Sequence, residues 1–359
     1  MLIQIIQLIR NKREQINEGP SRNRSRYLPV KVLVTGATGF IGGRIVSKLL
    51  EEGYEVVALV RTSSNTEGLP KPIDIREADL FDISSLKKAV QGVDAVIHCA
   101  AYFDFYPSDE VLMFKVNFEG TKNLMNACVG TGVERFIYCS TAETMGAIRY
   151  PPGTEDTELR PNFSYGESKI LAEQAIREIT DDTGLCHIIL RPTGVMGEGD
   201  LYVMYEVAQE LYNGKVFALP RDLSARIMYT HIDDVVSGFI SALTLMSALN
   251  NTIILCPDDA ISWDEFVEIM TTALEVDPPS LRVPSFLAKF GMALLSPFKN
   301  RKKMTFFWHP KSVDVMLSQR VYSNEKAKRL LGWEPQITMS EGLQRAIKWY
   351  FEQGLLEKG

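Results

Sequence analysis

The fold is decided by residues 30–42, which read VKVLVTGATGFIG. A short run rich in β-branched residues ends at a turn that carries three glycines, and a helix is expected to follow directly. A backbone without side chains can approach a pyrophosphate closely, and a helix N-terminus favours its negative charge. The spacing is GxxGxxG rather than the GxGxxG of the common dinucleotide fingerprint. The prediction of a dinucleotide site therefore depends on the position of the turn between a strand and a helix. The alternative is a tight turn without a ligand. The residues assigned to the cofactor here are Gly36, Thr38, Gly39, Phe40, Ile41 and Gly42.

Strand-like and helix-like segments alternate from residue 30 to about residue 256, which predicts an α/β fold. The expected strands are 30–34, 55–60, 73–78, 94–99, 135–139 and 187–190, with a further strand-like run at 253–256. The expected helices are 41–52, 108–130 and 164–182. Because the strands are apolar almost throughout, both faces of the sheet must be covered, and we predict a Rossmann-type doubly wound parallel sheet.

The pattern changes after about residue 195, where the alternation is lost and helices dominate. The segments Ser262–Glu265 and Thr338–Glu341 have the spacing of a capping box and should open helices. We therefore expect three parts. These are a disordered N-terminal extension (1–29), a Rossmann domain (30–198 plus 229–256) and a smaller, mostly helical substrate lobe (199–228 plus 257–359).

Composition narrows the class of protein. The 359 residues carry a formal net charge of −6, which argues against a nucleic-acid partner. Five scattered cysteines suit reduced thiols in a cytoplasmic protein, and four histidines without a ligand spacing predict no metal. The apolar run at 1–9 is too short to span a bilayer. Basic residues follow this run, whereas in a secretory signal they precede it. The alternative to a disordered extension is a helix that lies at a membrane interface.

The end of the second expected strand bears on the choice of cofactor. Dinucleotide folds read the adenine ribose there, with an acidic residue for a 2′-hydroxyl and an arginine for a 2′-phosphate. This chain has Arg61 and no acidic residue before Glu67, which favours NADP, with NAD as the alternative. Asp79 and Leu80, after the third strand, are assigned to the adenine, although an aspartate in a solvated loop would look the same.

Tyr165 and Lys169 stand four residues apart in an expected helix, so both side chains share one face. A cation beside a phenol favours the phenolate and lowers the pKa of the phenol from its usual value near ~10. The pair is therefore a candidate acid/base. A core tyrosine beside a solvated lysine is the alternative.

Seven motifs in order carry a family resemblance. They are TGATGFIG (35–42), HCAA (98–101), VNFEGTKNL (116–124), CSTAETMG (139–146), YGESK (165–169), LRPTGVMG (190–197) and HIDDV (231–235). With them, the chain resembles the extended short-chain dehydrogenase/reductase family, also called the NAD-dependent epimerase/dehydratase group, over about residues 30–355. Its pattern is most similar to the branch of dihydroflavonol reductases and 3β-hydroxysteroid dehydrogenases.

The resemblance implies roles for individual residues. Tyr165 would be the general acid/base, Lys169 would hold the nicotinamide ribose and lower the Tyr165 pKa, and Thr141 rather than Ser140 would hydrogen-bond the substrate oxygen. Asn117 would help to orient the lysine. The residues implied to line the nicotinamide and its ribose are Ala100, Ala101, Pro192 and Val195. His98, His231 and Asp234 are interpreted as structural.

Two departures bear on the reaction. Sugar-nucleotide members of the family usually carry an asparagine where this chain has Gly194, and an arginine at the position of Ile227, where Arg226 is displaced by one. The aromatic loop 102–107 suits a flat apolar substrate, although it could equally be packing beneath a lid. Substrate contact is assigned to Tyr102, Phe103, Thr141 and Gly194.

We therefore expect an NADP-dependent oxidoreductase that interconverts a ketone and a secondary alcohol on a small, largely apolar molecule. A sugar-nucleotide epimerase or dehydratase with a retained cofactor is one alternative, and a catalytically silent NADP-binding sensor is another. The apolar segment 283–298, followed by basic residues, predicts a buried helix, with peripheral membrane contact as the alternative and no transmembrane span. A homodimer is expected.

Overall fold

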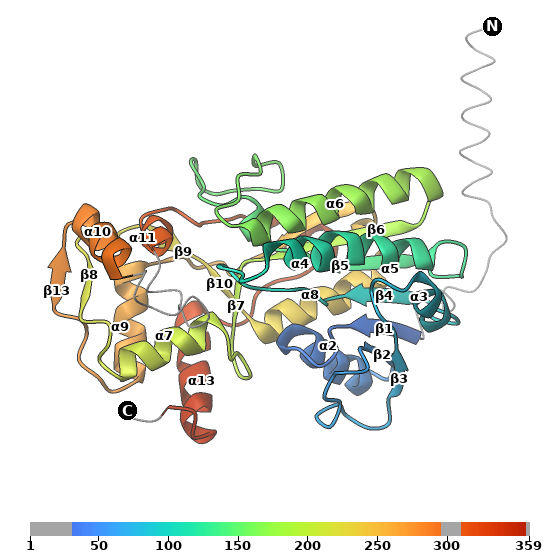
Figure 1. Cartoon of the computed structure of the whole chain (residues 1–359), viewed down its shortest axis with the longest axis horizontal. Helices are drawn as coiled ribbons and strands as arrows, with labels where there is room; N and C mark the ends of the chain where they lie inside the picture. Colours follow the sequence, from blue (N-terminus) through green and yellow to red (C-terminus); the bar gives the residue numbers. More distant parts are fainter. Residues whose placement is uncertain (1–30, 296–309, 357–359) are drawn as a thin grey trace, which may run out of the picture.

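A seven-stranded parallel sheet forms the centre of the molecule (Figure 1), in a computed structural model that describes residues 31–295 and 310–356. In spatial order its strands are β11 (Asn251–Leu255), β6 (Cys186–Pro192), β5 (Arg135–Cys139), β4 (Ala95–His98), β1 (Lys31–Thr35), β2 (Glu55–Val60) and β3 (Asp74–Glu77). The order reverses between β1 and β4, where a doubly wound sheet opens a crevice at the carboxyl ends of its strands. The predicted fold class is confirmed.

Alternate residues of the buried strands face opposite helical layers. Val32 and Val34 of β1 pack with one layer and Leu33 with the other, and all three are fully buried. The first layer contains α2 (Phe40–Glu51), α8 (Ile232–Thr244) and α12 (Glu325–Leu331). The second contains α3 (Ile83–Ala89), α5 (Gly120–Cys128) and α6 (Ser164–Thr183). Each buried branched side chain contributes about 1.5–3 kcal/mol, which explains the near-continuous apolar strands.

The expected helix 108–130 is interrupted. It consists of α4 (Glu110–Phe114), a π-helical turn η2 (Lys115–Glu119) and α5. A π-turn inserts an extra residue into a helix and is frequent at functional sites. Here it carries Asn117, whose side chain is buried beneath the loop that follows β4.

The C-terminal part of the chain packs a second apolar core, with Val207, Phe266 and Ile347 among its members. Its helices are α7 (Val203–Tyr212), α9 (Trp263–Ala273), α10 (Ser285–Leu295), α11 (Pro310–Met316) and α13 (Met339–Glu352). Short paired strands accompany the helices after residue 193: β7 (Gly194–Met196) with β10 (Tyr229–His231), β8 (Ala218–Pro220) with β13 (Leu281–Val283), and β9 (Arg226–Ile227) with β12 (Ile261–Ser262). The predicted capping box at Ser262 and Glu265 is present.

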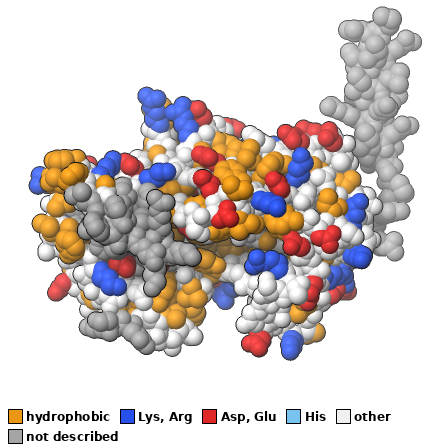
Figure 2. Space-filling model, in the orientation of Figure 1, with side chains coloured by type: hydrophobic (Ala, Val, Ile, Leu, Met, Phe, Trp, Pro, Cys, Tyr) orange, Lys and Arg blue, Asp and Glu red, His pale blue; other side chains and the backbone are white. Residues whose placement is uncertain are grey.

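Helix α10 differs from the prediction of a buried helix. Phe286, Leu287 and Phe290 are 69%, 48% and 62% exposed, and Figure 2 shows hydrophobic side chains gathered at this end of the molecule. Among residues 31–295 and 310–356, no helix is both long and apolar enough to cross a membrane. The expected extension 1–29 and the basic residues after residue 298 lie outside the described residues.

Candidate active site

A cavity of about 860 Å³ opens at the carboxyl edge of the sheet and is also walled by Met204, Trp263 and Val315 of the C-terminal part. The residues that the sequence assigned to cofactor and substrate line it together: Gly36, Thr38, Gly39, Phe40, Ile41, Gly42, Arg61, Asp79, Leu80, Ala100, Ala101, Tyr102, Phe103, Thr141, Tyr165, Lys169, Pro192, Gly194 and Val195. Asn117 is not among the lining residues. The fold thus gathers residues from six of the seven motifs around one space, and the HIDDV segment (231–235) does not line it.

The three positions of the turn require glycine for different physical reasons. Gly36 has φ +66°, and a Cβ there would lie 2.8 Å from the Ala100 nitrogen, while a Cβ on Gly42 would lie 2.2 Å from the Gly36 oxygen. These two positions are required by the packing of the chain on itself, which the interpretation as a pyrophosphate approach did not include. Gly39 is exposed at the cavity and serves as the N-cap of α2 without a side-chain cap.

The turn fits a dinucleotide phosphate. No acidic residue stands in the first turn of α2 and no side chain caps it, so its N-terminal amides remain available to bind an anion. Arg61 is exposed at the end of β2, and Asp79 accepts from the amide of Phe81 at 2.9 Å. The carboxylate of Asp79 therefore stabilises its own loop, while Arg61 is among the residues that line the cavity.

Tyr165 lies in the first turn of α6 and Lys169 one turn later. Lys169 is 2% exposed, and its Nζ lies 4.2 Å from the centre of the Tyr138 ring and 5.9 Å from that of Tyr165. Burial lowers the pKa of Lys169 to about 8, and burial raises the pKa of Tyr165 above its usual value. The expected lowering of the Tyr165 pKa is therefore wrong for this arrangement, since the net shift is upward and desolvation is its largest cause.

Thr141 and Ser140 differ in what they already bind. Ser140 is buried and donates to Glu173 Oε1 at 2.6 Å. Thr141 caps a short 3-10 turn by accepting from the Glu143 amide at 3.1 Å, which leaves its hydroxyl proton able to donate into the cavity. This geometry supports Thr141 as the hydroxyl that meets a substrate.

The side chain of Asn117 bonds the loop that follows β4 and Ser168, the residue before Lys169. Its Oδ1 accepts from the Tyr102 amide at 2.7 Å, and its Nδ2 donates to the Tyr102 carbonyl and to Ser168 Oγ. It thereby ties the substrate loop to α6 beside the Tyr165 backbone, to which Ser168 also donates.

A buried ion pair under α6 was missed by the sequence analysis. Arg191 donates to both carboxylate oxygens of Glu173, at 2.8 and 2.6 Å, and both side chains are at most 2% exposed. Glu173 stands four residues after Lys169 on the same helix. That spacing, together with the arginine of the LRP motif, is the only signal that the sequence offered.

Aromatic rings form the substrate end of the cavity. Phe103 meets Tyr165 edge to face, with 4.9 Å between ring centres, and also contacts Phe105 and Tyr202. A Cβ on Gly194 would lie 2.3 Å from the Tyr229 ring, so an asparagine cannot be placed here without moving that ring. Arg226 is exposed and bonds the Ala260 carbonyl instead of lining the cavity. The two sugar-nucleotide ligand positions are thus apolar in the structure as in the sequence.

Arg320 is a cavity cation that the sequence analysis did not identify. Its Nη1 lies 2.5 Å from Glu143 Oε2, and its Nη2 donates to Asn162 Oδ1 at 2.8 Å. Both members of the ion pair are 11% exposed. Arg320 is 177 residues from its partner, so no local pattern could have joined them.

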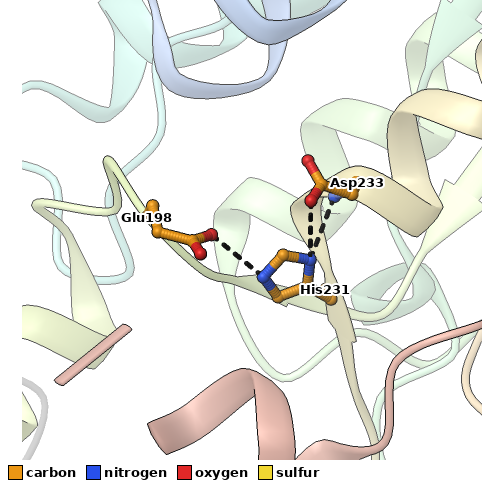
Figure 3. A group of neighbouring side chains, drawn as sticks. All are labelled: Glu198, His231 and Asp233. Carbon is orange, nitrogen blue, oxygen red and sulfur yellow. Dashed lines mark hydrogen bonds and ion pairs between the residues drawn. The ribbon is translucent and has the colours of Figure 1, made fainter. Parts of the chain in front are cut away.

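A second cluster lies outside the cavity floor (Figure 3). One ligand atom from each of Glu198, His231 and Asp233 falls within 4.8 Å of the others. Arg345 donates to Glu198 and to Asp233, and Arg44 donates to Asp233. Two guanidiniums already engage the oxygens that a cation would need, so we interpret the cluster as an ion-pair network that connects α2 with α13.

The residues interpreted as structural are satisfied within the protein. His98 bonds Thr35 and Thr121, His231 caps α8, and Asp234 accepts from the amides of Gln336 and Ile337. All five cysteines are free.

Comparisons with known proteins agree with this architecture. A model of the NAD dependent epimerase/dehydratase family matches residues 32–255. A 3-beta-hydroxysteroid dehydrogenase of Mycolicibacterium neoaurum is 28% identical over 337 residues, covering 89% of this chain and 91% of that protein. The decarboxylating sterol-4-alpha-carboxylate 3-dehydrogenase of Mus musculus is 28% identical over 331 residues, covering 89% of this chain and 90% of that protein.

Solved structures share the fold. The crystal structure of gox2253 aligns with a TM-score of 0.77 at 27% identity and covers 91% of this chain and 100% of its own. With a family match over more than half of its length, the chain belongs to the NAD dependent epimerase/dehydratase family, as an NAD(P)-dependent oxidoreductase of the extended short-chain dehydrogenase/reductase type that acts on CH–OH and C=O groups.

Proposed function

We propose that the protein interconverts a ketone and a secondary alcohol on a small, largely apolar substrate, with NADP as its cofactor. The observation that carries the proposal is the convergence of Tyr165, Lys169 and Thr141 on a cavity whose substrate end is aromatic. The apolar positions at Gly194 and Ile227 argue against a sugar nucleotide, because a diphosphate needs charged or polar partners there. The steroid and sterol relatives support an apolar skeleton.

The residues divide the work of the reaction. When bound, the nicotinamide supplies or accepts a hydride. Tyr165 gives its phenolic proton to the substrate oxygen in the reductive direction, and Thr141 donates a hydrogen bond to the same oxygen as charge develops. Burial raises the pKa of the Tyr165 phenol, so at neutral pH the side chain carries the proton that the reductive direction needs. The opposite direction needs the phenolate and should be favoured at alkaline pH.

Lys169 and Arg61 would serve the cofactor. Lys169 presents a buried ammonium beside Tyr165, where it would hold the hydroxyls of the nicotinamide ribose. Arg61 would pair with a 2′-phosphate at the end of β2, where this chain has no acidic residue for a 2′-hydroxyl. That absence favours NADP over NAD.

The test removes the phenolic proton. Tyr165→Phe should lower turnover of a ketone by about 10²–10⁴ while nucleotide binding persists. Tyr150→Phe is the matched control, since Tyr150 is 77% exposed and does not line the cavity. Turnover in Tyr165→Phe equal to that of Tyr150→Phe would refute the assigned acid.

Two alternatives give different readouts in the same assay. An epimerase or dehydratase would convert a sugar nucleotide without net change in nicotinamide absorbance and would ignore ketones. A sensor would bind NADPH, which fluorescence reports, with no turnover on any ketone or alcohol. The free hydroxyl of Thr141 and the cavity position of Tyr165 favour an enzyme over the sensor.

Peripheral membrane contact, a homodimer and a cytoplasmic location stay predictions. The exposed apolar side chains of α10 support the first of these, because an amphipathic surface of this kind can insert into a bilayer interface.

A further inference from the structure

The hydrogen-bond donors of Arg320, at the aromatic end of the cavity, do not all have partners. Arg320 has five N–H donors, of which Nη1 meets Glu143 and Nη2 meets Asn162. Its Nε is buried and has no hydrogen-bond partner among the described residues. A buried donor without a partner costs free energy, and native proteins rarely retain one without a purpose.

A second polar group lies in the same region, because Tyr229 carries a phenol and also lines the cavity. The backbone brings the two residues together, because Ile227, two residues before Tyr229, forms a β-bridge with Arg320.

Arg320 and Tyr229 form a polar corner of the cavity, and Glu143 connects this corner with Thr141 and Tyr165. Glu143 donates its amide to Thr141 Oγ1, and a Cβ on Gly166, the residue after Tyr165, would lie 2.9 Å from the Glu143 carbonyl oxygen. Thr141, Glu143 and Arg320 all line the cavity, so its wall continues from the groups that would meet the substrate carbonyl past Glu143 to Arg320.

Charge decides which kind of group fits. The Arg320 guanidinium is already paired with the Glu143 carboxylate, and both side chains are largely buried. An anionic group would have to approach Glu143 as well as Arg320, whereas a neutral oxygen only accepts the Nε proton. The corner thus suits a hydroxyl or carbonyl oxygen rather than a carboxylate or phosphate.

We propose that Arg320, with Tyr229, forms a subsite for a second, neutral oxygen of the substrate, remote from the reacting carbonyl. The proposal rests on the proposed ketone/alcohol reaction and makes Arg320 a specificity-determining residue within it. The substrate class becomes an apolar skeleton with oxygen at both ends. Sites built to hydrogen-bond a substrate oxygen reject the analogue that lacks it, because their own polar groups are then left unpaired.

The experiment uses three fused-ring ketones that share one skeleton: the parent ketone, a hydroxy-ketone and a keto-carboxylate. The wild-type protein should show a kcat/KM for the hydroxy-ketone about tenfold or more above that for the parent, and the keto-carboxylate should be the poorest of the three. In Arg320→Lys, which keeps a cation opposite Glu143 but loses Nε, the preference for the hydroxy-ketone should fall toward unity.

Two further variants keep the test interpretable. Removing Arg320 alone would strand the buried carboxylate of Glu143, so Arg320→Met is combined with Glu143→Gln. Arg226→Met is the matched control, since Arg226 stands on the paired strand but bonds Ala260 and does not line the cavity. Its selectivity should equal that of wild type.

The outcomes separate this inference from the proposed function. Reduction of the parent and the hydroxy-ketone with equal kcat/KM, or a preference that survives Arg320→Lys, would overturn the subsite while the reaction stands. A preference for the keto-carboxylate would contradict the inference that the subsite binds a neutral oxygen. If no ketone is reduced although NADPH binds, the proposed function itself fails.

Discussion

Glu173→Ala should destabilise the protein strongly, although the residue lies outside the cavity. The Glu173 carboxylate is fully buried and accepts from Ser140, from Arg191 twice and from Arg177, at 2.6–2.9 Å. These bonds join α6 to the ends of β5 and β6. Truncation would leave Arg191, which is 2% exposed, as an unpaired buried cation.

The expected loss is about 3–5 kcal/mol, the cost of removing one partner of a buried ion pair. Domains are stable by only ~5–15 kcal/mol, so the variant should unfold at a much lower urea concentration. Glu178→Ala, at an exposed position of the same helix, should change the free energy of unfolding by less than about 0.5 kcal/mol. Replacing both charges, as in Glu173→Leu with Arg191→Met, should restore most of the stability.

The pair also predicts a dependence on pH. Burial opposes ionisation of Glu173, but the bonds from Arg191 and Ser140 outweigh it, so its pKa in the folded protein lies below the usual 4.5. Its contribution to stability is therefore complete above that value and is lost as the pH falls through the folded-state pKa. Urea unfolding followed by circular dichroism, for both single variants at neutral and acidic pH, measures this. A loss in Glu173→Ala no larger than in Glu178→Ala would refute the reasoning.

Three other predictions concern binding. Arg61→Ala should reduce the preference for NADPH over NADH by about ten- to a hundredfold, which is the value of a charge-assisted contact. Titration calorimetry with both nucleotides measures this preference, and an unchanged ratio of the two affinities would contradict the assignment. Because the pKa of Lys169 is lowered to about 8, its ammonium loses its charge as the pH rises through that value, and nucleotide affinity should fall over the same range. Lys169→Arg stays charged, so its nucleotide affinity should not fall there. Phe286→Ser with Phe290→Ser should abolish co-sedimentation with anionic vesicles, and vesicle binding that is weak in wild type or unaltered in the variant would count against membrane contact through α10.

Local patterns predicted what depends on neighbours in the sequence. The strand–glycine turn–helix order predicted the sheet, and the Tyr165/Lys169 spacing placed both side chains on one wall of the cavity, because a helix fixes which residues share a face. The preference for Thr141 over Ser140 also agrees with the geometry, in which Ser140 is already bound to Glu173.

What escaped prediction depends on distant partners. Arg320 and Glu143 meet across 177 residues, and Glu173 and Arg191 across two elements of structure. The sign of the Tyr165 pKa shift was mistaken for the same reason: spacing on a helix gives proximity to Lys169 but not the depth of burial, and burial dominates. The π-turn at Asn117 leaves no mark in a helical pattern, since it changes the helix by one residue.

The walls of the cavity come from almost the entire chain, from Thr35 to Tyr322, and Asp233 connects Arg44 of α2 to Arg345 of α13. On the ribosome, all seven strands are therefore complete before the last wall of the cavity has been synthesised. A proteolytic fragment that ends after β11 would retain the whole sheet but no Arg320. Splitting the gene between α10 and α11 should accordingly yield two inactive halves whose reassembly can be scored by recovered nucleotide binding.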